Sequence, residues 1–127
     1  MSEVTVNVRY MVDAVEAAIE WYTKHLGFSL LSNQAPAFAD IKRGSLRLLL
    51  SGPTSSAGRP MHDGERPRPG GWNRIHLIVD DLPAEVTRLR AAGVQFRNDI
   101  VMGPGGSQIL LLDPSGNIVE LFQLARH

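Results

Sequence analysis

The feature that most constrains this 127-residue chain is an internal repeat. Each half has an alternating apolar segment, then an amphipathic helical segment that ends at a glycine, and then three short segments typical of strands. Val12 and Val79 end the first segments 67 residues apart, and Gly27 and Gly93 end the helical segments 66 residues apart. The repeated order predicts two tandem βαβββ modules within a single α+β domain. A duplicated unit tends to build one shared cleft between its copies, so we also expect a cleft between the modules.

The first module is expected to cover residues 1–52. Alternating polarity over residues 4–12 predicts a strand with one apolar face. A helix should begin after Asp13, which lies three residues before Glu16 as in a capping box, and should end at Gly27. Three strands are then expected over residues 28–32, 38–42 and 45–51.

The linker over residues 53–71 is rich in proline, glycine and serine and has no periodicity, which predicts a loop. The second module, residues 72–127, should begin with a strand over residues 74–79. Asp80-Asp81 is placed to cap a helix that ends near Gly93. The remaining strands are expected over residues 94–97 or 94–101, 108–113 and 117–124, with a hairpin or rim loop at 103–106.

Charge and composition narrow the classes of protein. Thirteen Lys and Arg residues balance thirteen Asp and Glu residues, so no net field exists to collect nucleic acid or an anionic membrane. The absence of cysteine excludes disulfide scaffolds, thiolate metal sites and cysteine nucleophiles. The start of the chain lacks the pattern of a secretory signal, and the apolar runs are too short to cross a bilayer. We therefore expect a cytoplasmic protein that binds neither nucleic acid nor membrane.

Four segments of the chain resemble the vicinal oxygen chelate superfamily. They are WYTKHLGF in the first module, IHLIVDDL and VTRLRAAGV in the second, and the closing LLLDPSGNIVELFQ. The superfamily contains glyoxalase I, extradiol dioxygenases, and fosfomycin and bleomycin resistance proteins, so it includes both enzymes and plain binding proteins. The resemblance implies that the two modules form a curved mixed sheet, a half-barrel, around a concave cleft. It also implies a homodimer, which is common among members of this length.

The resemblance further implies where a metal would bind. Metal-dependent members take one ligand from the first strand and one from the last strand of each module. In this sequence those positions are Asn7, Leu48, Arg74 and Glu120. Leucine cannot coordinate, asparagine coordinates weakly, and arginine is a permanent cation without an acceptor atom. Only Glu120 is a good ligand, so we expect no metal and no other cofactor.

Arg74 is expected to replace the positive charge of the missing metal. A guanidinium can bind a carboxylate through two parallel hydrogen bonds, so we expect a bidentate pair between Arg74 and Glu120 inside the cleft. His76 lies two residues further along the same strand face. It could act as an acid–base group, because imidazole changes charge near neutral pH, or it could simply line the cavity.

Trp72 follows two glycines at the end of the linker. Its indole could close over the cleft and stack on a planar ligand, or it could anchor the loop to the rim. Phe122 shares a strand face with Glu120 and makes that face partly apolar, as in many small-molecule sites. The candidate ligand-binding residues are Asn7, Arg9, Leu48, Trp72, Arg74, His76, Glu120 and Phe122.

Three functions are open from the sequence, and it does not decide whether the protein is an enzyme. The favoured one is a metal-free protein that binds, or sequesters, a small and partly aromatic organic molecule. A neutral or anionic compound suits Arg9, Arg74 and Trp72. The second is a metal-free isomerase or lyase with His76 and Glu120 as catalytic proton carriers. The least favoured is a metal-dependent lyase or dioxygenase with a relocated site.

Overall fold

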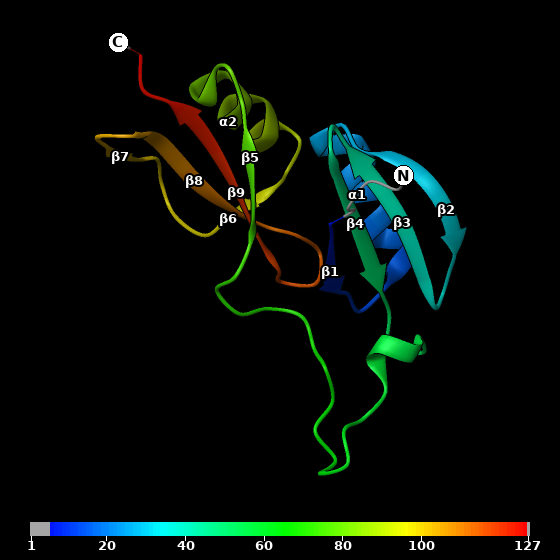
Figure 1. Ribbon diagram of the computed structural model, residues 1–127. Helices are drawn as coiled ribbons and strands as arrows, with labels where there is room; N and C mark the ends of the chain where they lie inside the picture. The colour runs from blue at the N-terminus through cyan, green and yellow to red at the C-terminus, as the bar shows by residue number, and fades with distance from the viewer. Residues whose placement is uncertain (1–5, 127) are drawn as a thin grey trace, which may run out of the picture. The chain divides into compact units, whose positions relative to one another are not determined.

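The computed structural model describes residues 6–126 and divides into two compact units at Gly70 and Gly71. Each unit has one sheet and one α-helix and corresponds to one expected module (Figure 1). Both sheets are mixed and open, so the predicted α+β fold of two βαβββ modules is confirmed. The first two residues of the strand expected over 4–12 lie outside the described range. The concave cleft shared by the modules stays a prediction.

The first unit is a four-stranded sheet with strand order β1-β4-β3-β2, in which β1 runs parallel to β4. Its elements are β1 (Asn7–Met11), α1 (Val15–Leu26), β2 (Ser29–Gln34), β3 (Phe38–Arg43), β4 (Leu46–Ser51) and the 3-10 turn η1 (Ser56–Gly58). The strands expected after the first helix are confirmed, with ends that shift by one or two residues. The expected linker loop contains η1 as its one short helical turn.

Helix α1 packs on one face of this sheet because its apolar residues recur on one side. Its buried residues are Val15, Ala18, Ile19, Tyr22 and Leu26. The helix ends as predicted at Gly27, which has a left-handed φ of 69°. The expected capping box is wrong: the N-cap is Ala14, which makes no side-chain capping hydrogen bond. Glu16 thus falls at the second helical position instead of the third, where the reciprocal bond forms.

The second unit is a five-stranded sheet in which β5 runs parallel to β9, and β8 pairs with β9, β6 and β7. Its elements are β5 (Ile75–Ile78), α2 (Leu82–Ala91), β6 (Gln95–Phe96), β7 (Val101–Gly103), β8 (Gly106–Leu112) and β9 (Ile118–Leu124). Strand β6 lies within the shorter range expected from the sequence, 94–97. The longer alternative, one strand over 94–101, is wrong, because β6 and β7 are separate strands that both pair with β8. Between them Asn98 interrupts the ladder, because its Oδ1 accepts from the Leu110 amide at 2.9 Å.

Two aspartates fix the connections of the second unit. Asp81 caps α2 as predicted, because its carboxylate accepts from the Ala84 amide at 3.1 Å. Asp113 is buried, and its Oδ1 accepts from the amides of Ser115 and Asn117 at 2.8 and 2.9 Å. The aspartate of the DPSGN segment therefore holds the turn that leads from β8 into β9.

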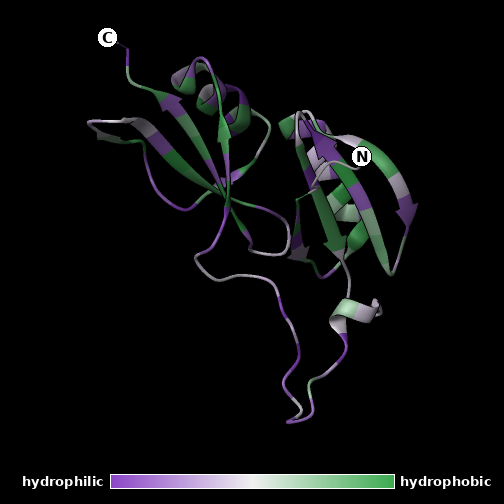
Figure 2. Ribbon diagram, in the orientation of Figure 1, coloured by the Kyte–Doolittle hydropathy of each residue, from purple (hydrophilic) through white to green (hydrophobic). Residues whose placement is uncertain are grey.

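The distribution of apolar residues follows these elements. Figure 2 shows apolar residues concentrated on the strands and helices, and mostly polar residues along the segment between η1 and β5. On β5 buried residues alternate with exposed ones: the first and third residues are buried, and the second and fourth are exposed. Strands β3, β8 and β9 instead contain runs of three or four buried residues. One face of β5 is therefore core, and its other face can carry polar side chains.

The hairpin between β7 and β8 depends on a glycine. Gly103 pairs with Gly106, which confirms the hairpin interpretation of residues 103–106. A β-carbon built at Gly106 would lie 2.1 Å from the carbonyl oxygen of Gln123 and 2.9 Å from Cζ of Phe122. Strands β8 and β9 can approach this closely only because residue 106 has no side chain.

Gly106→Ala should lower the free energy of unfolding by about 2–4 kcal/mol, because the added methyl group must displace the β9 backbone and the Phe122 ring. Gly105→Ala is the control, since a β-carbon there would come no closer than 4.0 Å to Phe122 Cζ. Urea unfolding followed by circular dichroism measures both variants. Equal losses in the two variants would contradict the close approach.

Candidate functional site

The candidate site lies on the exposed face of the second sheet. The register of β5 and β9 places His76 opposite Glu120 and Ile78 opposite Phe122. His76 and Ile78 are both exposed, whereas their neighbours on β5 point into the core. We call the face formed by these four residues the open face of the second sheet. The alternation of β5 and β9 thus brings a histidine, a carboxylate and an aromatic ring together.

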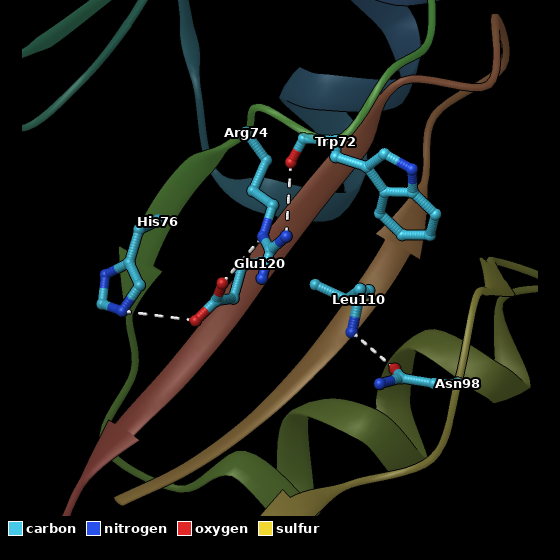
Figure 3. A network of polar contacts seen from close by, with 6 residues as sticks. All are labelled: Trp72, Arg74, His76, Asn98, Leu110 and Glu120. Carbon is cyan, nitrogen blue, oxygen red and sulfur yellow. Dashed lines mark hydrogen bonds and ion pairs between the residues drawn. The ribbon is translucent and has the colours of Figure 1, made fainter. Parts of the chain in front are cut away.

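The Glu120 carboxylate lies between two nitrogen-bearing side chains (Figure 3). Its Oε1 accepts a hydrogen bond from Arg74 Nε at 2.9 Å, and its Oε2 lies 3.4 Å from His76 Nε2. The Glu120 side chain is only 8% exposed, against 27% for Arg74 and 46% for His76. A carboxylate this buried is unfavourable without a cationic partner, because desolvating a charge is costly. The predicted pairing of Arg74 with Glu120 is confirmed.

Arg74 is also held by the backbone. Its Nη1 donates to the carbonyl oxygen of Trp72 at 3.2 Å, so the guanidinium connects the end of the linker to β9. The bond to Glu120 runs through Nε and the bond to Trp72 through Nη1, so the expectation of a bidentate pair with Glu120 is wrong. A planar guanidinium fixed by two acceptors has little rotational freedom, so its charge stays beside Oε1 of Glu120.

Of the three side chains of Arg74, His76 and Glu120, that of His76 is the most exposed. Its ring lies 4.8 Å from the Phe122 ring, measured between centroids, with an interplanar angle of 36°. The two rings and the carboxylate therefore form one continuous surface on which a bound molecule could contact the imidazole. Both interpretations from the sequence, an acid–base group and a residue that lines the site, stay predictions.

Trp72 is 63% exposed. The guanidinium carbon of Arg97 lies 5.5 Å from the centroid of the indole, which is a cation–π contact. In Figure 3 the indole extends away from the Arg74 side chain. The contact with Arg97 favours an anchor for the end of the linker, and the exposed fraction leaves indole surface available for a ligand. Stacking of Trp72 on a ligand stays a prediction.

The strand registers correct one assignment made from the sequence. Glu120 lies opposite His76, and the residue that takes the place of His76 in the first unit, Arg9, lies opposite Leu49. Leu49 is therefore the counterpart of Glu120. Leu48 is 0% exposed and belongs to the core, so the expectation that it contacts a ligand is wrong. The sequence comparison of β4 with β9 was therefore one residue out of register. In a strand, a shift of one residue moves a side chain to the opposite face of the sheet.

The open face of the first sheet carries Asn7 and Arg9, as expected, together with Leu49. The sequence reasoning missed Asp40 and Arg47, which form an ion pair on this face. The available signal was the position of Asp40 between two apolar residues in an alternating strand, because such a position points away from the core.

The four family metal positions, with the register corrected, do not fit a divalent metal. Leu49 offers no donor atom, and the guanidinium of Arg74 repels a cation. Both oxygens of Glu120 already lie close to nitrogen atoms of other side chains. Within residues 6–126, no group of three or more His, Cys, Asp or Glu side chains is placed to hold a metal ion.

The chain matches a protein-family model over residues 5–121, and that model describes the Glyoxalase/Bleomycin resistance protein/Dioxygenase superfamily. The match extends through both units, so the chain belongs to this superfamily, and the resemblance noted in the sequence is confirmed. Among curated proteins, none matched the chain. In the part of the chain that the structure describes, neither α-helix is long and apolar enough to span a bilayer.

Solved structures with different functions share this fold. Lactoylglutathione lyase from Agrobacterium tumefaciens has a TM-score of 0.75 and 22% identity, over 97% of this chain and 94% of that one. TnmS3, an antibiotic-binding protein from Streptomyces sp. CB03234, has a TM-score of 0.69 and 24% identity, over 98% and 100%. The fosfomycin resistance protein FosX from Listeria monocytogenes has a TM-score of 0.72 and 12% identity, over 98% and 96%. At these identities the likeness shows the fold alone.

Arg74→Met should lower the free energy of unfolding by about 2–4 kcal/mol, because it leaves the buried Glu120 carboxylate without its cation. Glu120→Gln should have a smaller effect, since Arg74 reaches solvent. A double-mutant cycle, measured by urea unfolding, should give a coupling of about 1–2 kcal/mol.

The ion pair between Glu85 and Arg88 on α2 is the control for this cycle. Its side chains are 34% and 49% exposed, so its coupling should stay below about 0.5 kcal/mol. Coupling at Arg74 and Glu120 no larger than in this surface pair would contradict the account of the site.

Proposed function

We propose that the protein binds a small, partly aromatic organic molecule through the open faces of its sheets, and that it does so without a metal. The observation that carries the proposal is the ion pair between Arg74 and Glu120. The resemblance makes Glu120 a metal-ligand position, and here a guanidinium occupies the place beside its carboxylate. The open face of the second sheet keeps charged and hydrogen-bonding groups, but it lacks the ligand atoms that a divalent metal ion would need.

The surroundings of this pair favour a neutral or anionic ligand with an aromatic part. Arg74 is 27% exposed, so its guanidinium is within reach of an acceptor on a ligand. The adjacent rings of His76 and Phe122 give a ligand ring an apolar surface to pack on. A few polar groups beside apolar rings are the usual composition of a small-molecule site.

A binding role agrees with the shared fold of TnmS3, which is an antibiotic-binding protein. At 24% identity, that likeness shows a shared fold, so the binding role and the ligand of this chain are matters for experiment. A homodimer, which size-exclusion chromatography with light scattering can test, and a cytoplasmic location belong to the same proposal.

The second candidate function is a metal-free isomerase or lyase. It is favoured by the distance of 3.4 Å between His76 Nε2 and Glu120 Oε2, because adjacent imidazole and carboxylate groups can pass a proton between them. The more exposed His76 would remove a proton from one atom of the substrate and return it to another. His76→Gln tests the enzyme, since an isomerase or lyase would convert a compound only with His76 present, whereas a binding protein would convert no compound in either form.

The proposed function is tested by a thermal-shift screen of aromatic acids, phenols and planar antibiotics in buffer with EDTA. A compound that raises the melting temperature in EDTA, and does so less with Glu120→Gln, supports metal-free binding at this site. Stabilisation that disappears in EDTA and returns with nickel, zinc or manganese would contradict it.

Protein purified without chelators should contain far less than one transition metal ion per chain, because the residues at the family metal positions are not a donor set. Elemental analysis by mass spectrometry measures this content. Added nickel, zinc or manganese should leave the melting temperature unchanged. About one ion per chain, together with a large stabilisation by one of these metals, would show that a metal site exists.

Trp72→Ala should weaken binding of an aromatic ligand by about 1–3 kcal/mol, the usual loss when an aromatic contact at a site is removed. Quenching of tryptophan fluorescence gives the affinity. Trp21→Phe provides the background, because Trp21 lies on α1 and its ring packs against Tyr22 at 4.8 Å. Unchanged affinity in Trp72→Ala would leave only the anchor role.

A further inference from the structure

The open face of the first sheet holds a cavity of about 290 Å³, which the pair between Arg74 and Glu120 does not account for. Strands β1, β3 and β4 and the segment at η1 supply its walls. Its polar lining consists of Asn7, Arg9, Asp40, Arg47, Ser55 and Ser56. The lining therefore includes two cationic side chains and one anionic side chain.

The charges of this cavity do not cancel. Asp40 is 8% exposed and forms its ion pair with Arg47, so one of the two arginines is neutralised. Arg9 donates to the hydroxyl of Ser51 at 2.9 Å, which is a neutral partner. None of the ion pairs within residues 6–126 includes Arg9. One positive charge is therefore in excess.

The two arginines are placed to act on one group. In the parallel ladder of β1 and β4, Asn7 lies opposite Arg47 and Arg9 lies opposite Leu49, so the arginines are diagonal neighbours on the same face. Arg47 keeps donor capacity beyond Asp40, because its side chain is 43% exposed and a guanidinium has five N–H donors. Exposed guanidinium donors favour a group with acceptor oxygens.

We propose that this cavity binds the carboxylate of an aromatic acid between Arg9 and Arg47, with the ring against Phe38 and Leu49. The inference rests on the proposed function, because Arg9 is one of its candidate ligand-binding residues, and it adds the chemical class of the ligand. A planar carboxylate matches the donors of guanidinium groups. The volume suits a single-ring acid, since typical ligand pockets begin at roughly 300 Å³.

The test is a titration of the full chain with sodium benzoate, followed by amide chemical shifts in ¹H–¹⁵N NMR spectra. Shifts should centre on the residues that line the cavity. Benzamide, which has the same shape without the charge, should bind at least fivefold more weakly. If benzamide binds as tightly as benzoate, or if the chemical shift changes centre on other residues, the proposed carboxylate site is wrong. Inorganic phosphate that competes as strongly as benzoate would overturn the carboxylate class.

Arg9→Gln should weaken benzoate binding at least fivefold, whereas Arg68→Gln should leave it within twofold, because the Arg68 side chain is 80% exposed in the linker and does not line the cavity. If Arg9→Gln does not fold, Arg9→Lys replaces it. That variant keeps the charge but not the planar donors, and it should also bind benzoate more weakly than the unchanged protein. Unchanged affinity in the Arg9 variant that folds would overturn the inference.

The inference and the proposed function can fail separately. If no aromatic compound depends on Glu120 while benzoate still depends on Arg9, the function proposed for the second sheet is wrong and the carboxylate site stands. If an aromatic ligand depends on Glu120 but neither it nor benzoate depends on Arg9, the carboxylate site is wrong and the proposed function stands.

Discussion

A buried carboxylate on β9 sets the chemistry of the second unit. Glu120 is 8% exposed in its side chain, and a charge at that depth is tolerated only with a compensating cation. Arg74 supplies the cation from just before β5, and its second bond, to the carbonyl oxygen of Trp72, fixes where the linker ends. This ion pair connects the end of the linker to β9, and it lies at a position that the sequence resemblance assigns to a metal ligand.

The two units keep the same packing and differ on their open faces. In both ladders the first strand runs parallel to the last, and the helix-facing residues are apolar. Where the second unit has His76 opposite Glu120, the first has Arg9 opposite Leu49. The repeat thus conserves what the core requires, and the residues that face outward, which packing constrains less, carry the differences in chemistry.

The fold could be predicted from the sequence because period-two and helical patterns repeat in both halves. The pair between Arg74 and Glu120 could also be predicted, since a resemblance placed both residues at facing positions. Leu48 could not be placed correctly, because a shift of one residue between two apolar strands leaves the hydrophobic pattern almost unchanged while it reverses the faces. The hydrogen bond from Arg74 to the Trp72 carbonyl could not be predicted either, because every residue has a backbone carbonyl and the sequence does not indicate which one accepts.

The claim that Arg74 takes the place of a metal is tested most directly by isothermal titration calorimetry with zinc. The unchanged protein, stripped with chelator, is compared with Arg74→His, which adds an imidazole beside His76 and Glu120 and so brings two histidines and a carboxylate together. We expect no measurable zinc binding by the unchanged protein and at least a tenfold gain in affinity with Arg74→His. One zinc ion bound per chain by the unchanged protein, as tightly as by the variant, would contradict it.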